Sequence, residues 1–128
     1  MKRINYDGKV SKADLTQMAQ TIISYLRGEC PNPLVAMTER ARQYFTWGAK
    51  KFYTIEAKDG SYGIQFNVTG LKHRGRVRVW YNVGMDLFDI ELLRARTDVA
   101  VYECEGLDCF QLHNVLHQHI ERTDDPEV

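Results

Sequence analysis

Apolar residues recur every three or four positions near both ends of the chain, which is the spacing of one face of an α-helix. The first such stripe comprises Leu15, Met18, Ala19, Ile22, Ile23 and Leu26. Ser11 precedes the stripe and Asp14 follows Ser11 by three residues, an arrangement typical of a capping box at a helix start. Gly28 is a stop signal. The pattern therefore predicts a first helix between Ser11 and Gly28.

A second, less regular stripe follows the turn sequence "CPNP" at residues 30–33. Its members share one helix face: Leu34, Met37, Ala41, Tyr44 and Phe45. Pro33 suits the first position of a helix, because its missing N–H would have no partner there. Thr38 is an alternative start, and Gly48 is expected to end this second helix.

From residue 51 the apolar period changes to two, which is the period of a β-strand. Two alternating segments flank Asp59 and Gly60, a strong signal for a two-residue hairpin loop. This loop places Ile55 opposite Ile64 on an apolar face that also holds Tyr53, Ala57, Tyr62 and Phe66. The other face is expected to be mostly solvated, and it carries Phe52, Thr54, Glu56, Gly63, Gln65 and Asn67.

Two further segments, "RVRVWYNV" and "MDLFDIELL", predict a second hairpin with a tight turn at Val83 and Gly84. In that register Val79 faces Phe88 in the core. The opposite face pairs residues of the two strands across the sheet: Arg76 with Glu91, Arg78 with Asp89, and Trp80 with Leu87. The segment "DVAVYEC" at 98–104 is predicted to be a fifth strand.

The last apolar stripe follows Asp108, which suits an N-cap because Gln111 stands three residues later and completes a capping box. Leu107 and Leu112 occupy the positions of a hydrophobic staple. The stripe itself consists of Leu112, Val115, Leu116 and Ile120. A helix is therefore expected from Asp108 to about Arg122.

Strands grouped in the middle of the chain, with helices at both ends, indicate the α+β class. We expect a five-stranded, mostly antiparallel meander sheet with two N-terminal helices and one C-terminal helix packed on one face. Residues 1–122 are predicted to form a single domain. Residues 123–128 are acidic and have almost nothing to bury, so we expect a flexible tail.

The composition fits one ordinary domain: 128 residues, 44% of them hydrophobic, are enough to bury a core. Lys plus Arg and Asp plus Glu number 17 each, so the chain as a whole lacks the basic excess of many nucleic-acid-binding proteins. No apolar run has the length of a membrane span and the N-terminus does not resemble a signal peptide. The sequence therefore predicts a cytoplasmic protein, with no membrane partner, whose three cysteines are mostly reduced.

Cysteine and histidine cluster near the C-terminus, in the segment "CEGLDCFQLHNVLH" at 104–117. A metal site is disfavoured because Cys109 and His117 would lie about 12 Å apart on a helix, at about 1.5 Å per residue. His113 and His117 have the spacing of a zinc helix but no evident third ligand. Cys109 at a helix start could form a reactive thiolate, with His113 as its base, although Asp108 opposes this.

We expect the simpler alternative for this cluster. Cys109 is predicted to pack as a small apolar residue, and His113 and His117 to lie on the helix surface. His119 falls within the apolar stripe, where either it is buried and hydrogen-bonded or the helix bends away; the first alternative is favoured over a role as a lone ligand. No metal and no cofactor is predicted.

The stretch "LKHRGRVRVWY" at 71–81 is the second candidate site. Arg76, Arg78 and Trp80 alternate on one strand face, and Lys72 and Arg74 lie in the loop before it. Basic residues beside an aromatic ring are typical of sheets that bind single-stranded nucleic acid. The predicted register opposes this function, because Asp89 and Glu91 would neutralise both strand arginines.

A protein interface is the other possibility for the same face. Trp80 and Leu87, with Phe52 and Leu93 beside them, would form an apolar patch on the solvated side of the sheet. A covering segment could equally bury this patch.

The sequence does not determine a function. It contains no Gly-rich phosphate loop, no G-x-S-x-G and no H-E-x-x-H motif, so a catalytic role is not favoured. The favoured hypothesis is a non-catalytic interaction or regulatory module with a protein partner. The alternative is binding of single-stranded DNA or RNA by the sheet face and the basic stretch 71–78. The candidate binding residues are Lys72, Arg74, Arg76, Arg78, Trp80 and Leu87.

Overall fold

The structure is a computed structural model that describes residues 12–27, 37–57, 61–82 and 84–121. Its helices are α1 (Lys12–Leu26), α2 (Met37–Thr46) and α3 (Cys109–Ile120). Its strands are β1 (Lys50–Glu56), β2 (Tyr62–Thr69), β3 (Arg74–Asn82), β4 (Leu87–Arg94) and β5 (Ala100–Leu107). The predicted features at Ser11, Gly28, Pro33, Asp59, Gly60 and Val83, and the predicted tail at 123–128, lie outside the described residues.

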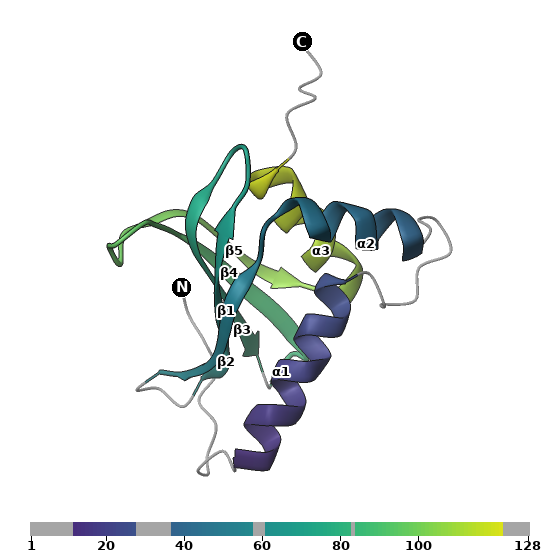
Figure 1. Ribbon diagram of the computed structural model, residues 1–128. Coiled ribbons are helices and arrows are strands. Elements are labelled where there is room, and N and C mark those ends of the chain that lie inside the picture. Colours follow the sequence, from purple (N-terminus) through teal and green to yellow (C-terminus); the bar gives the residue numbers. More distant parts are fainter. Residues whose placement is uncertain (1–11, 28–36, 58–60, 83, 122–128) are drawn as a thin grey trace.

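The five strands form one sheet in the order β1-β2-β3-β4-β5, and every neighbouring pair is antiparallel. The three described helices lie on one side of this sheet (Figure 1). The α+β class, the meander and the one-sided helix layer that the sequence predicts are therefore confirmed.

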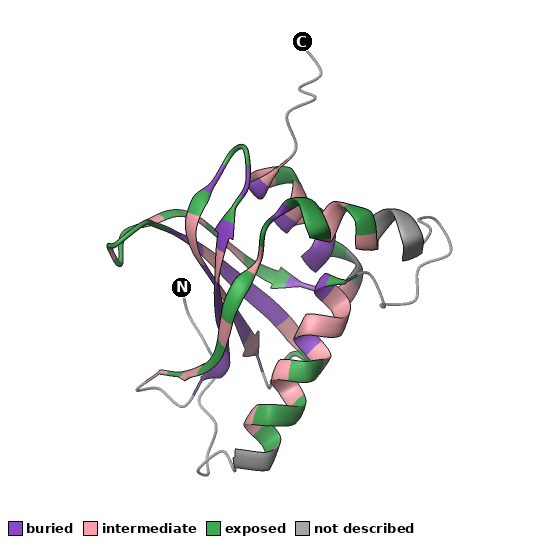
Figure 2. Cartoon of the chain, in the orientation of Figure 1, coloured by how far each residue is buried: buried purple, intermediate pink, exposed green. Residues whose placement is uncertain are grey.

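The core lies between the sheet and the helices, and buried residues concentrate along the strands of the sheet (Figure 2). The sheet contributes Ile64, Phe66, Val77, Val79, Ile90 and Leu92, and the helices contribute Ile22, Leu26, Leu112, Leu116 and Ile120. Trp47, directly after α2, is fully buried in the same cluster. Each such large apolar side chain stabilises the fold by about 1.5–3 kcal/mol.

The predicted register of the first hairpin is wrong by one residue. Ile55 pairs with Gly63 and Thr54 pairs with Ile64, and the Ala57 amide donates to the Ser61 carbonyl. Because side chains alternate, a slip of one exchanges the two faces of β1. Phe52 consequently packs on the core and stacks on Phe66, with ring centroids 4.9 Å apart. Tyr53 is on the outer face.

The predicted register of the second hairpin is wrong by two residues, which changes the pairs but keeps the faces. Val79 pairs with Ile90 instead of Phe88, and Asn82 pairs with Leu87. The strands therefore end at Asn82 and Leu87, and the Asn82 side-chain oxygen accepts a hydrogen bond from the Met85 amide. A two-residue type I′ turn needs positive φ at both positions, which β-branched valine disfavours, so the longer turn is favoured.

Helix α3 begins as predicted. Asp108 is its N-cap and forms a capping box with Gln111. At the other end, the Ile120 carbonyl, which has no intrahelical donor, accepts hydrogen bonds from the Lys72 and His73 amides. The basic segment around Lys72, predicted to be a free loop, therefore also caps the C-terminal end of α3.

The prediction for the histidines of α3 is wrong in part, because His113 is fully buried. Its Nδ1–H donates to the Leu26 carbonyl at 2.8 Å, and its Nε2 lies 2.9 Å from the side-chain oxygen of Gln43. His117 Nδ1 accepts a hydrogen bond of 3.0 Å from the indole N–H of Trp47. These contacts join α3 to the other two helices.

His119 and Cys109 of α3 differ in how far they match the sequence predictions. His119 stacks on Tyr102 with centroids 3.8 Å apart, and its Nδ1–H donates to the Val115 carbonyl, so it is hydrogen-bonded as expected. Cys109 is disulfide-bonded, whereas Cys104 is free. The expectation of reduced cysteines is therefore wrong for Cys109, and a bonded sulfur cannot serve as a nucleophilic thiolate.

Candidate nucleic-acid interface

An open depression of about 740 Å³ lies at one end of the sheet. Its described lining comes from the start of β1, the end of β2, the start of β3 and the β4–β5 loop. These residues are Lys50, Lys51, Asn67, Val68, Thr69, Arg74, Gly75, Arg76, Ala95, Arg96, Thr97 and Asp98. We call this depression the basic pocket. The meander creates it, because in antiparallel strands the starts of β1 and β3 lie beside the ends of β2 and β4.

The described lining of the basic pocket carries a strong excess of positive charge. Lys50, Lys51, Arg74, Arg76 and Arg96 are cationic, and Asp98 is the one carboxylate among the described lining residues. In the part of the chain that the structure describes, Asp98 pairs with Arg76 and Arg78. The other four lining cations form no ion pair with a described residue. The pocket therefore has a positive field available to an anion.

The backbone is unusual at two of these cations. Lys51 has a φ of 59° and Arg96 a φ of 63°, both in the left-handed region that non-glycine residues seldom adopt. Lys51 stands where the β1–β2 register shifts, between the pairs made by Lys50 and Tyr53. Such bulges redirect a side chain and are frequent beside binding sites.

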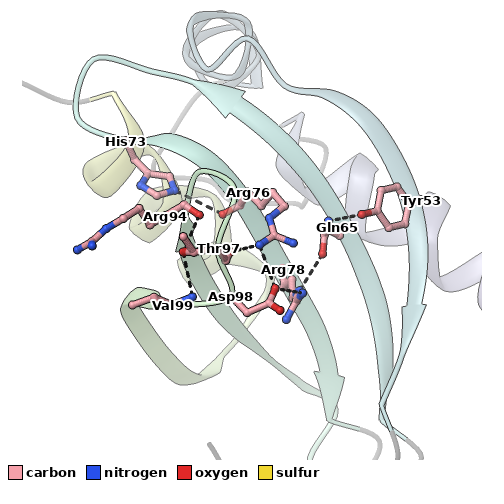
Figure 3. Close-up of polar contacts among 9 residues, drawn as sticks. All are labelled: Tyr53, Gln65, His73, Arg76, Arg78, Arg94, Thr97, Asp98 and Val99. Atoms are coloured by element: carbon pink, nitrogen blue, oxygen red, sulfur yellow. Dashed lines mark hydrogen bonds and ion pairs between the residues drawn. The ribbon is translucent and has the colours of Figure 1, made fainter.

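A chain of polar contacts crosses the outer face next to the pocket (Figure 3). Arg76 donates to Asp98 at 3.0 Å and also to the Thr97 carbonyl. Arg78 donates to the same Asp98 oxygen at 3.3 Å and, through Nε, to the Gln65 oxygen at 2.8 Å. Gln65 in turn donates to the Tyr53 hydroxyl. The chain thus ties the β4–β5 loop to β3, β2 and β1.

The predicted acidic partners of the strand arginines are wrong. Arg76 lies opposite Leu93, and Arg78 lies opposite Glu91. Asp89, expected to pair with Arg78, is buried and accepts a hydrogen bond from the Gly106 amide. The two-residue shift explains the change, and Asp98 supplies the negative charge instead.

Lys72 and His73, just before β3, and Arg74, its first residue, have different roles. Arg74 is exposed and lines the basic pocket, whereas Lys72 is exposed but is not part of the described lining. His73 between them is buried. Burial lowers the pKa of His73 below its usual 6.5, and hydrogen bonds to the backbone of Arg76 and Leu93 oppose that shift. The lowered pKa favours the neutral form of His73.

The apolar residues of the candidate set do not form an open patch. Trp80 is only 5% exposed and donates its indole N–H to Glu91 at 2.5 Å. Leu93 is 1% exposed, and Leu87 at the start of β4 is half-buried. Phe52 faces the core, where it stacks on Phe66.

The sequence reasoning missed Lys50, Lys51 and Arg96, which supply most of the unpaired charge. A signal existed: basic residues flank the start of β1, the start of β3 and the end of β4, and a meander gathers these three points at one end.

Within the described residues, no group of three or more His, Cys, Asp or Glu side chains is arranged to hold a metal ion. No described helix has the length and apolar character needed to cross a membrane. Comparisons with protein-family models, curated proteins and solved structures found no match to this chain.

Proposed function

We propose that this protein is a non-catalytic module that binds single-stranded nucleic acid, with the phosphate backbone in the basic pocket. The observation that carries the proposal is the cationic lining, of which Lys50, Lys51, Arg74 and Arg96 pair with no described carboxylate. Neutralising phosphates with such side chains releases condensed counterions, which is the main source of non-specific affinity for nucleic acid.

Binding is favoured over catalysis by the chemistry of the lining. The described lining residues include no histidine, cysteine or serine, and the hydroxyl of the lining residue Thr97 is engaged with the Arg94 carbonyl and the Val99 amide. The one described carboxylate, Asp98, is held by two arginines and is poorly placed to accept a proton.

A protein partner, which the sequence favours, stays a prediction. It rests on an exposed patch around Trp80 and Leu87, and the burial of Trp80 weakens that support. The pocket offers an anion a charged surface, whereas the described outer face offers little contiguous apolar area. Nucleic acid therefore replaces a protein partner as the favoured ligand.

The location of the protein in the cell also stays a prediction. The sequence favours the cytoplasm, where thiols are usually reduced. The disulfide at Cys109 is more typical of an oxidising compartment.

Fluorescence anisotropy with labelled oligo-dT and oligo-U tests the proposal. If four cations neutralise phosphates, log Kd should depend on log salt with a slope of about 3 in magnitude, because each neutralised phosphate contributes about 0.7 for a single strand. Affinity should then fall roughly 50-fold between about 50 and 200 mM salt.

Charge-removing variants localise the binding. Lys50→Gln with Lys51→Gln, and separately Arg96→Gln, should weaken binding and lower the slope by about 0.7 for each phosphate that is no longer neutralised. Arg27→Gln is the matched control, because Arg27 is exposed and directly follows α1 in the helix layer. Equal decreases in affinity in the control and pocket variants, or no measurable binding at low salt, would refute the proposal.

A further inference from the structure

We infer that Tyr53 is the stacking platform of this site and holds a nucleobase beside the phosphate-binding pocket. This inference rests on the proposed function. It adds a residue outside the described pocket lining, and it names the part of the ligand, an unpaired base, that this residue takes.

Tyr53 lies on the same face of the sheet as the pocket. It pairs with Gln65, and the next residue on that face of β2 is Asn67, which lines the pocket. Tyr53 is also only two residues from Lys51, a separation of at most about 7 Å along the chain. A phosphate in the pocket and a base at Tyr53 can therefore belong to the same or to neighbouring nucleotides.

The ring is accessible, and its polar end is held. Tyr53 is 54% exposed, on the edge strand of the sheet. Its hydroxyl accepts a hydrogen bond from Gln65, which is buried and bonded in turn to Arg78 (Figure 3). A ring fixed in this way loses little conformational freedom when a ligand stacks on it, which favours binding.

Cations in the pocket together with the exposed ring of Tyr53 favour single-stranded nucleic acid over other polyanions. A polyphosphate or an acidic peptide would use the cations but would gain little from the ring. A duplex hides the faces of its bases, whereas a single strand can place one against an aromatic side chain. The other large exposed aromatic residue in the described ranges, Phe45, is on α2 and is not among the described lining residues of the pocket.

The experiment compares Tyr53→Leu with Phe45→Leu, which removes an exposed ring from the helix layer. Each variant is titrated with oligo-dT, with oligo-U and with an abasic deoxyribose-phosphate oligomer of equal length. Tyr53→Leu should weaken binding of both base-bearing oligomers about ten-fold or more. It should leave binding of the abasic oligomer unchanged. Phe45→Leu should change none of the three affinities.

Tyr53→Phe separates stacking from the hydrogen-bonded chain. It keeps the ring and removes the hydroxyl, so it should retain most of the affinity for oligo-dT. A decrease in affinity in Tyr53→Leu that is equal for oligo-dT and the abasic oligomer would overturn the inference, as would no decrease at all. If pocket variants still weaken binding in either case, the proposed function stands without Tyr53. If the unaltered protein binds none of the oligomers, both fail.

Discussion

Replacing Asp98 by asparagine should strengthen nucleic-acid binding, and a gain of affinity is harder to produce by misfolding than a loss. Asp98 is the one described carboxylate of the basic pocket, and it lies 3.0 Å from Arg76 and 3.3 Å from Arg78. Asparagine has nearly the same shape and keeps an oxygen that can accept hydrogen bonds from both guanidinium groups. The substitution therefore removes charge with little change in geometry.

The size of the gain follows from the distances between these charged groups. At a separation of about 6 Å, a phosphate in the basic pocket and the Asp98 carboxylate would repel each other by about 0.7 kcal/mol in bulk water. Removing that repulsion corresponds to about a three-fold gain in affinity. Two arginines freed from their carboxylate can also neutralise phosphates, and each adds about 0.7 to the salt slope. We expect binding that is about three- to ten-fold tighter at low salt.

The assay is oligo-dT anisotropy at several salt concentrations, with Glu56→Gln as the control. Glu56 is exposed and lies six residues along β1 from Lys50, about 20 Å at about 3.3 Å per residue. That distance is about two Debye lengths at about 0.1 M salt, so the same change in net charge should have little effect there. Weaker binding in Asp98→Asn, or an equal gain in Glu56→Gln, would refute the electrostatic argument.

Three further predictions concern the fold that carries the site. Gly63→Ala should cost about 3 kcal/mol or more in urea unfolding, because a β-carbon there would overlap the Val79 carbonyl oxygen; a normal midpoint would contradict the strand spacing. His113→Leu should cost about 2–4 kcal/mol, because it leaves buried acceptors such as the Leu26 carbonyl without their donor; a cost below about 1 kcal/mol would contradict this. His73, whose pKa burial lowers, contributes stability above pH 6.5 that is lost as the pH falls through its folded pKa. The free energy of unfolding should therefore drop less between about pH 7.5 and pH 5 in His73→Gln than in the unaltered protein, and equal drops would refute this.

The type and order of the elements can be predicted because local chemistry decides them. The change of apolar period after α2 separates helices from strands, and the capping box at Asp108 and Gln111 marks the start of α3. The faces of β3 are also predicted correctly, because a shift of two residues preserves the alternation. These features depend on residues that are close together in the chain.

The registers could not be predicted, because competing arrangements differ by little in local preference. In β1 both faces carry apolar residues, so alternation alone does not choose between Phe52 and Tyr53 for the core. Stacking of Phe52 on Phe66, together with the shift at Lys51, decides the arrangement. Burial of His113 was missed for a related reason, since its hydrogen-bond partners, Leu26 and Gln43, are contributed by other helices.

The sequence predicts only part of the candidate site, because the lining residues come from several neighbouring strands and not from one continuous segment. The stretch 71–78 by itself identifies only Arg74 of the unpaired lining cations, because its other two arginines, Arg76 and Arg78, form ion pairs with Asp98. The meander adds cations from the start of β1 and from the β4–β5 loop at the same end of the sheet.

The opposite end of the sheet carries acidic residues instead. Glu56 ends β1, Asp86 lies in the β3–β4 turn, and Glu105 lies near the end of β5. Among the described residues, the strand ends and turns of the sheet thus carry mostly positive charge at one end and negative charge at the other. Such a separation attracts a polyanion to one end and repels it from the other. Overall neutrality, which argues against nucleic acid at the level of composition, is therefore compatible with a basic binding surface.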